Sequence, residues 1–184
     1  MDSLENHLLI AMPSLGDTFF HRTVTYICEH NEEGAMGLII NLPVNVTLNE
    51  LLSQLDADKK SLPSLEKMVL TGGPVSPDRG FVLHSPQNSW KSSLALSDEI
   101  MITTSKDILM ALGTELSPPD YLVTLGYAGW GPGQLEQEIQ ENSWLTTPAD
   151  SEILFKTPIE KRWQKAAEKL GIDVAHLSSE VGHA

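Results

Sequence analysis

The sequence is poor in cysteine, in positive charge and in long apolar runs. Cys28 is the single cysteine of 184 residues, so no disulfide can form within the chain and a reducing, cytoplasmic compartment is expected. The longest early apolar run, Leu8–Met12, is too short to span a bilayer or to form a signal core, so no membrane partner is expected. With 12 basic against 25 acidic residues, a formal charge of −13, the chain lacks the clustered bases that direct nucleic-acid binding requires.

What the sequence does have is the composition of an ordinary folded protein. Hydrophobic residues make up 41% and charged residues 20%, and no low-complexity tract argues for disorder. A chain of this length suits one core. We therefore predict one compact domain over residues 1–184, with a loose tail at 176–184.

The N-terminal third predicts strands. His7–Met12 is typical of a buried strand, and Thr23–Glu29 alternates with a period of two and is rich in β-branched residues. Asn31–Gly34 supplies turn residues, after which Met36–Asn41 is apolar again. These segments predict an antiparallel hairpin in the central sheet.

Capping signals mark the helices. Thr47 and Glu50 form a capping box before a helix to about Leu55. Thr157 as N-cap and Pro158 at N1 predict a C-terminal helix over residues 158–170. That helix is expected to dock on the core through one face, formed by Ile159, Trp163, Ala166, Ala167 and Leu170.

The central stretch Tyr121–Trp144 reads as a strand, a glycine-rich loop over Gly126–Gly133 and a short acidic helix from Gln134. A further strand and helix precede it from Ile100. This strand, helix, strand, helix order predicts at least one parallel crossover. The expected fold class is therefore α/β (mixed α+β), a mixed β-sheet with the N-terminal antiparallel hairpin and helices packed on it.

Four blocks stand together in order: LLIAMPSLGD at 8–17, EHNEEGAMGLIINLP at 29–43, GGPVSPDRGFVLH at 72–84 and LGYAGWGPGQLEQEIQENSWL at 125–145. In this order and spacing the chain resembles, over nearly its whole length, the AlgH/YqgE family of small bacterial proteins. The resemblance implies a compact cytosolic α/β unit without a settled activity. The family name is linked to regulation of alginate synthesis, and some members are labelled transcriptional regulators. The acidic charge and the lack of a DNA-reading helix make direct DNA binding the least favoured function.

Cys28 and His30 are the candidate catalytic pair. Two residues apart on a strand, they are expected to share a face, which would let the imidazole activate the thiol of a hydrolase or thiol enzyme. Alternatively, Cys28 continues the apolar face as a small buried hydrophobe, and His30 bonds a backbone carbonyl near the turn. His30 and His84 could approach each other as zinc ligands, but neither lies in a histidine-rich helix motif or beside a spaced cysteine pair. No metal and no cofactor are therefore expected.

The two glycine-rich loops are the other candidates. The spacing G-x-x-G-x-G-x-G, with no Lys-Ser or Lys-Thr after it, fits neither familiar nucleotide-binding pattern. In Gly72–Gly80, Arg79 either binds an anion or pairs with Glu136 or Glu138, and the salt bridge is favoured. Asn41 is expected to bond backbone in a turn. The resulting set of ligand-binding candidates is His30, Asn41, Gly72, Gly73, Asp78, Arg79, His84, Gly129, Trp130, Gln134 and Glu138.

These residues lead to one functional hypothesis. The two loops and His30 frame a shared pocket for a small molecule or a partner segment, and the protein is a soluble regulatory or interaction module rather than an enzyme. The thiol enzyme is the alternative. The sequence identifies neither the ligand, the protein partner nor the oligomeric state.

Overall fold

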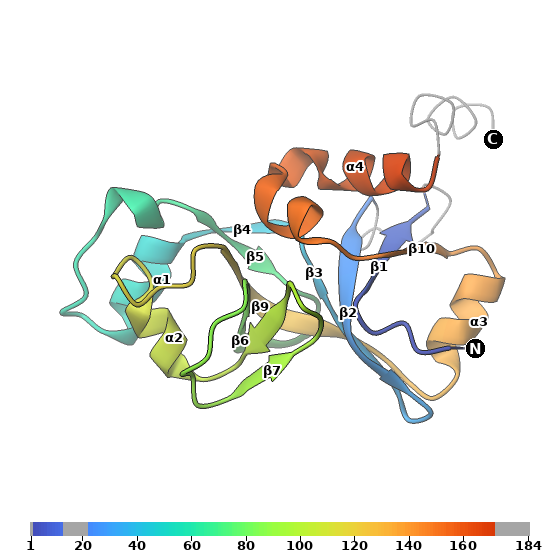
Figure 1. Ribbon diagram of the computed structural model, residues 1–184, viewed down its shortest axis with the longest axis horizontal. Helices are drawn as coiled ribbons and strands as arrows, with labels where there is room; N and C mark the ends of the chain where they lie inside the picture. Colours follow the sequence, from blue (N-terminus) through green and yellow to red (C-terminus); the bar gives the residue numbers. More distant parts are fainter. Residues whose placement is uncertain (1, 13–21, 172–184) are drawn as a thin grey trace.

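The computed structural model describes residues 2–12 and 22–171, so the predicted loose tail at 176–184 lies outside the described residues. Strands predominate along the chain, and the helices are short (Figure 1). The elements, in order, are β1 (His7–Ala11), β2 (Val24–Asn31), β3 (Gly34–Ile39), β4 (Pro43–Thr47), α1 (Leu48–Leu55), η1 (Pro63–Leu65), β5 (Met68–Thr71), β6 (Val75–His84), β7 (Ser93–Ala95), β8 (Met101–Thr103), α2 (Lys106–Ala111), β9 (Tyr121–Trp130), α3 (Gln134–Gln140), β10 (Trp144–Pro148), η2 (Glu152–Lys156), η3 (Ile159–Lys161) and α4 (Arg162–Lys169).

The strands form one strongly curled sheet. Its main path runs β10-β1-β2-β3-β9-β6-β8-β7, and β5 attaches to β9 and carries β4 on its other side. Helix α4 lies across β1 and β2, α3 stands near the N-terminal end of the chain, and α1 and α2 lie at the opposite end of the molecule (Figure 1).

The predicted α/β class with a helical parallel crossover is wrong, because the sheet is predominantly antiparallel. Strands β8 and β9 are joined through α2, but β6 lies between them and pairs antiparallel with both. Strands β9 and β10 are joined through α3 and are separated by three other strands. One short parallel contact exists, two residue pairs long, between β5 and β9, and no predicted crossover contains it. An alternation of strand and helix patterns in the sequence predicts that strands exist. It does not show that an earlier strand lies between two consecutive ones in the sheet.

The predicted N-terminal hairpin is confirmed as β2 and β3, which pair antiparallel. The pairing is interrupted at Cys28, because Ile27 faces Gly37 while Glu29 faces Met36. One extra residue on β2 is a β-bulge, and it exchanges the faces toward which the following side chains point.

Both glycine-rich segments are largely strands, not loops. Strand β9 continues through Gly126 and Gly129 to Trp130, and β6 begins at Val75. Gly126 has φ +77°, and a Cβ placed there would lie 2.5 Å from the carbonyl oxygen of Gly73. Glycine at this position therefore allows β9 to approach the residues before β6 closely. It does not mark a ligand-binding loop.

The helix caps are partly as predicted. The Thr47 side chain accepts a hydrogen bond from the amide of Glu50, which confirms the capping box of α1. Thr157 does not cap the C-terminal helix, because its hydroxyl donates to the carbonyl of Glu152. The chain instead passes through the π-helical turn η2 and the 3₁₀ turn η3 before α4 starts at Arg162.

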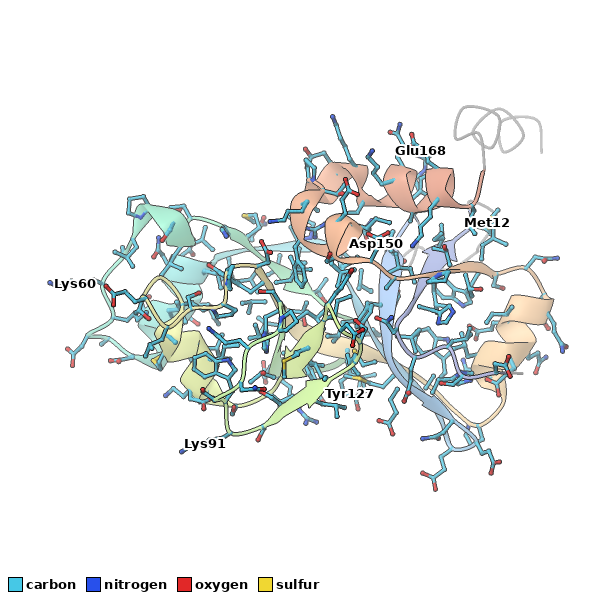
Figure 2. The ribbon with its side chains drawn as sticks, in the orientation of Figure 1. Met12, Lys60, Lys91, Tyr127, Asp150 and Glu168 are labelled. Atoms are coloured by element: carbon cyan, nitrogen blue, oxygen red, sulfur yellow. The ribbon has the colours of Figure 1, made fainter. Side chains whose placement is uncertain are left out.

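Three buried apolar clusters hold the fold together. The largest lies between the concave sheet and α4, where Trp163, Ala166 and Ala167 meet side chains of β1, β2, β3 and β6. The second joins α1 and α2 to β5, β6 and β9. The third lies on the other side of β1 and β2, where α3 contributes Leu135. The end of α4 is tied back by Lys169, which lies 3.0 Å from the Asp150 carboxylate beneath that helix (Figure 2).

Candidate functional site

Cys28 and His30 do not form a catalytic pair, because the bulge places them on opposite faces of β2. Cys28 belongs to the same apolar cluster as Tyr26, whereas His30 pairs across the strands with Ala35, which packs on the α3 side. Burial raises the pKa of the Cys28 thiol far above its usual range, and a protonated thiol is a poor nucleophile. The alternative prediction, a small buried hydrophobe, describes this position.

His30 is fully engaged in structural hydrogen bonds. Its Nδ1 accepts from the amide of Leu4 at 2.9 Å, so Nε2 is the nitrogen that carries the proton, and Nε2 donates to the Glu136 carboxylate at 3.0 Å. The predicted partner, a carbonyl near the turn, is thus replaced by two groups far away in the sequence. His30 thus connects the N-terminal segment to α3. The hydrogen bond from His30 to Glu136 is the chief cause of the lowered pKa of Glu136.

Glu138 is the centre of a second structural network. Its Oε1 accepts from the indole nitrogens of Trp130 at 3.0 Å and Trp144 at 2.8 Å, and its Oε2 accepts from Gln134 at 2.8 Å. Gln134 in turn accepts from the Gly131 amide. These candidates therefore fix α3 against β9 and β10, and the two indole rings meet edge to face.

The predicted salt bridge from Arg79 to α3 is not formed. The carboxylates of Glu136 and Glu138 have the partners just described, and the Arg79 guanidinium lies 5.2 Å from the centroid of the Phe81 ring. Asp78 is exposed beside it. A bound anion at Arg79 stays a prediction without further support.

The two glycine-rich segments are in direct backbone contact with each other. A Cβ at Gly72 would lie 2.3 Å from the Gly126 carbonyl, and one at Gly73 would lie 2.1 Å from the Tyr127 carbonyl carbon. Gly129 pairs with Met36 within the sheet. A small cavity does lie at His30, but its walls are Ser3, Asn31, Glu32 and Glu136. The predicted pocket shared by both segments and His30 thus gains no support.

Asn41 and His84 also have structural partners. Asn41 accepts from the Val24 amide at 2.8 Å and donates to the Arg22 carbonyl at 3.0 Å, which confirms its predicted bond to backbone. His84 is fully buried, and its ring nitrogens contact the Ser85 carbonyl and the Thr103 hydroxyl. Burial lowers the pKa of His84. Across residues 2–12 and 22–171, no three His, Cys, Asp or Glu side chains are grouped to hold a metal.

A different cavity carries the strongest candidate site. It has a volume of about 360 Å³ and lies where β5 and the start of β9 meet the C-terminal segment. Such a volume falls within the range of small-molecule sites, roughly 300–1,000 Å³. Seven lining residues come from β5, β9 and their surroundings and five from the C-terminal segment: Leu48, Lys67, Met68, Leu70, Tyr121, Leu122, Val123, Phe155, Pro158, Ile159, Glu160 and Arg162.

Arg162 is the distinctive residue of this cavity. Its side chain is 5% exposed, and it donates through Nε to the Thr157 carbonyl at 3.0 Å and through Nη1 to the Ile40 carbonyl. No carboxylate forms an ion pair with it among the described residues. Burial lowers the pKa of Arg162 to about 10, so the guanidinium is still charged at neutral pH. A buried positive charge that forms no ion pair is costly, and an anionic ligand would offset that cost.

The polar groups around Arg162 are few. Lys67 lines the cavity, with its ammonium 4.5 Å from the centroid of the Tyr121 ring. Glu160 is the carboxylate of the lining, exposed at the rim, and it opposes the lowering of the Arg162 pKa. The cavity therefore carries two positive charges and one negative charge, set against an otherwise apolar wall.

The sequence contained a signal for Arg162. It stands three residues after Ile159 and four before Ala166, which places it on the apolar face predicted for the C-terminal helix. A base on a buried face requires dedicated partners. Lys67 and Tyr121 carry no comparable signal, because only the fold brings β5 beside β9.

Taken together, the fold and this cavity define a class of small β-rich proteins in which a C-terminal helical segment closes a charged cavity at one side of a curled antiparallel sheet. No described helix is long and apolar enough to cross a membrane. Residues 8–175 match the AlgH-like family. The chain is 64% identical to a UPF0301 protein of Colwellia psychrerythraea and 58% identical to one of Pseudoalteromonas translucida, with each chain covered in full. It therefore belongs to the AlgH-like family.

Solved structures agree with that assignment. The solution structure of the AlgH protein from Pseudomonas aeruginosa is similar with a TM-score of 0.81 and 46% identity, over 100% of this chain and 99% of that one. A crystal structure of a Corynebacterium diphtheriae protein shares the fold with a TM-score of 0.71, at 19% identity and over 92% and 88% of the two chains.

Proposed function

We propose that this protein is a soluble regulatory or interaction module that binds a small molecule in the cavity between β5, β9 and the C-terminal segment. The observation that carries the proposal is the composition of the cavity wall. Leu70, Tyr121 and Val123 come from the sheet, while Phe155 comes from η2 and Arg162 from the start of α4. A ligand in this cavity would contact both parts at once.

Occupancy of the cavity would then control how firmly α4 is held on the sheet. Arg162 is the first residue of α4 and already reaches across to the Ile40 carbonyl. The next residue, Trp163, donates to the Ala11 carbonyl at 3.0 Å. A ligand that contacts Arg162 stabilises the docked arrangement by mass action, and the exposed face of α4 can report that change to a partner protein.

The thiol-enzyme alternative lacks a supporting observation, because Cys28 and His30 lie on opposite faces of β2. Of the polar candidates, His30, Asn41, His84, Trp130, Gln134 and Glu138 hold structural hydrogen bonds. A binding function at the cavity therefore accounts for the buried Arg162 guanidinium, which forms no ion pair with a carboxylate of the described residues.

The proposal is tested by a titration that does not depend on ligand charge. Benzyl alcohol and phenylacetate are added to the full chain while amide chemical shifts and amide hydrogen exchange are recorded. We expect shifts at Leu70, Val123 and Phe155 and slower exchange in Arg162–Lys169 with at least one probe. The proposed function is wrong if neither probe perturbs those amides.

A matched pair of variants controls for non-specific binding. Ile159→Trp places a bulky ring in the cavity wall and should abolish the response. Leu94→Trp introduces the same ring at an exposed position on β7, outside this cavity, and should leave the response unchanged.

A further inference from the structure

We propose that this cavity selects a small amphipathic monocarboxylate, with the carboxylate bound by Arg162 and an apolar body bound by the opposite wall. The inference rests on the proposed function, since it names the ligand class of the same site. Four features lead to it: the free donors of Arg162, the local charge balance, the apolar wall and the volume.

Arg162 retains donors for a ligand. Its two hydrogen bonds to backbone carbonyls use Nε and Nη1, and Nη2 has no partner among the described residues. The only fully enclosed side-chain atoms without a partner in that part of the chain are the hydroxyls of Thr25 and Thr124. Nη2 is therefore not fully enclosed, and since Arg162 lines the cavity, we infer that this nitrogen is open to a ligand there, with its position fixed in advance by the two carbonyls. A planar guanidinium held in this way matches a planar carboxylate.

The charge balance favours one negative charge on the ligand. Arg162 and Lys67 contribute two positive charges to the lining and Glu160 one negative charge, so a monoanion neutralises the site. A phosphate monoester carries close to two charges at neutral pH. It would meet the Glu160 carboxylate and the net charge of −13 of the whole chain, which disfavours a dianion.

The uncharged residues of the wall are mostly apolar and suit an apolar ligand body. Leu70 and Val123 are buried on the sheet side, and Phe155 and Ile159 are half-buried on the C-terminal side. Tyr121 adds an aromatic ring whose other contact is the Lys67 ammonium. A ring or a branched aliphatic chain of a few carbon atoms fits a cavity of about 360 Å³ and removes this apolar surface from water.

The test compares phenylacetate with phenylacetamide, which has nearly the same shape and no charge. Binding to the full chain is measured at pH 7 by calorimetry and by amide shifts at Leu70 and Val123. Because a hydrogen bond to a charged group stabilises more than a neutral one, we expect phenylacetate to bind roughly 10- to 100-fold more tightly. Arg162→Gln should abolish that preference.

Two further variants keep the test decisive if Arg162→Gln fails to fold. Lys67→Gln removes an exposed charge at the cavity and should reduce the preference for phenylacetate severalfold. Arg79→Gln makes the same change in net charge at a distant position beside Phe81 and should not alter it. Equal effects of the two variants would overturn the inference, because they would show an effect of net charge alone.

The outcomes separate the inference from the proposed function. If acid and amide bind equally well at the cavity, a pocket exists and the selection of a carboxylate is wrong. If neither they nor benzyl alcohol bind, both proposals fail together.

Discussion

Gly126→Ala should destabilise the protein severely, because β9 and the start of β6 meet at this residue. An alanine Cβ would lie 2.5 Å from the Gly73 oxygen, 3.1 Å from the Val75 oxygen and 3.2 Å from the Pro77 Cα. All three are backbone atoms, so none can move aside by a change of rotamer. The φ of +77° adds the strain of a left-handed conformation.

The magnitude follows from these two contributions. A non-glycine residue in the left-handed region costs about 1–2 kcal/mol, and overpacking against rigid neighbours costs about 1–3 kcal/mol more. We expect the free energy of unfolding to fall by about 2–5 kcal/mol, a large fraction of the roughly 5–15 kcal/mol typical of a folded domain.

Gly80→Ala is the matched control on the facing strand. Its Cβ would find no atom closer than Leu125 Cδ2 at 4.0 Å, so we expect little change or a slight gain in stability. Both variants are unfolded in urea, and the midpoint is compared at constant m-value. If the two free energies of unfolding agree within about 0.5 kcal/mol, the explanation of Gly126 as a residue of close approach is refuted.

Three other predictions concern the networks around β2 and α3. Glu138→Gln turns an acceptor of two indole N–H groups into a partial donor, so we expect a loss of about 1–3 kcal/mol, read by tryptophan fluorescence during denaturation. Native Cys28 should react with a thiol reagent at pH 8 only as fast as the protein opens, because burial raises its pKa, and rapid labelling of the folded state would contradict this. The pKa of Glu136 is lowered from its ordinary 4.5 chiefly by the hydrogen bond from His30. Its contribution to stability is therefore complete well above pH 4.5 and is lost as the pH falls through the lowered value. The stability difference between the protein and Glu136→Gln should narrow below pH 4.5, and a constant difference would rule out the linkage.

Local signals predicted local structure well. The hairpin of β2 and β3 follows from alternation and a turn, and the capping box of α1 from the Thr47–Glu50 spacing. Both depend on neighbours in the sequence. The glycines of β9 misled the prediction, because glycine marks a close approach of two strands as readily as it marks a loop.

The sequence did not predict which strands pair when they lie far apart in the chain. Nothing near Gln134–Gln140 indicates that β10 returns to the far edge beside β1, and the short strand β7 carries no pattern of its own. Strand adjacency is decided by which apolar faces match across the whole chain. The parallel crossover was wrong for this reason.

The candidate residues shared another limitation. The polar candidates lie in otherwise apolar or glycine-rich surroundings, and such residues are hydrogen-bonded partners in a packed interior more often than ligands: His30, Asn41, His84 and Glu138. Arg162 lies within a run of bases and acids that hides its signal, although its spacing places it on the buried face.

The extra residue at Cys28 has a consequence for the architecture as a whole. Before this residue, Tyr26 packs in the apolar cluster beneath α4. After it, His30 points to the other face and bonds Glu136 of α3. Strand β2 contacts both layers on either side of the bulge, since Ile27 already packs on the α3 side, and the bulge changes which alternate residues face each layer. Deleting Cys28 would make the Ile27–Gly37 and Glu29–Met36 pairs consecutive, so the strand would lose its bulge but keep its register and the faces of the residues that follow.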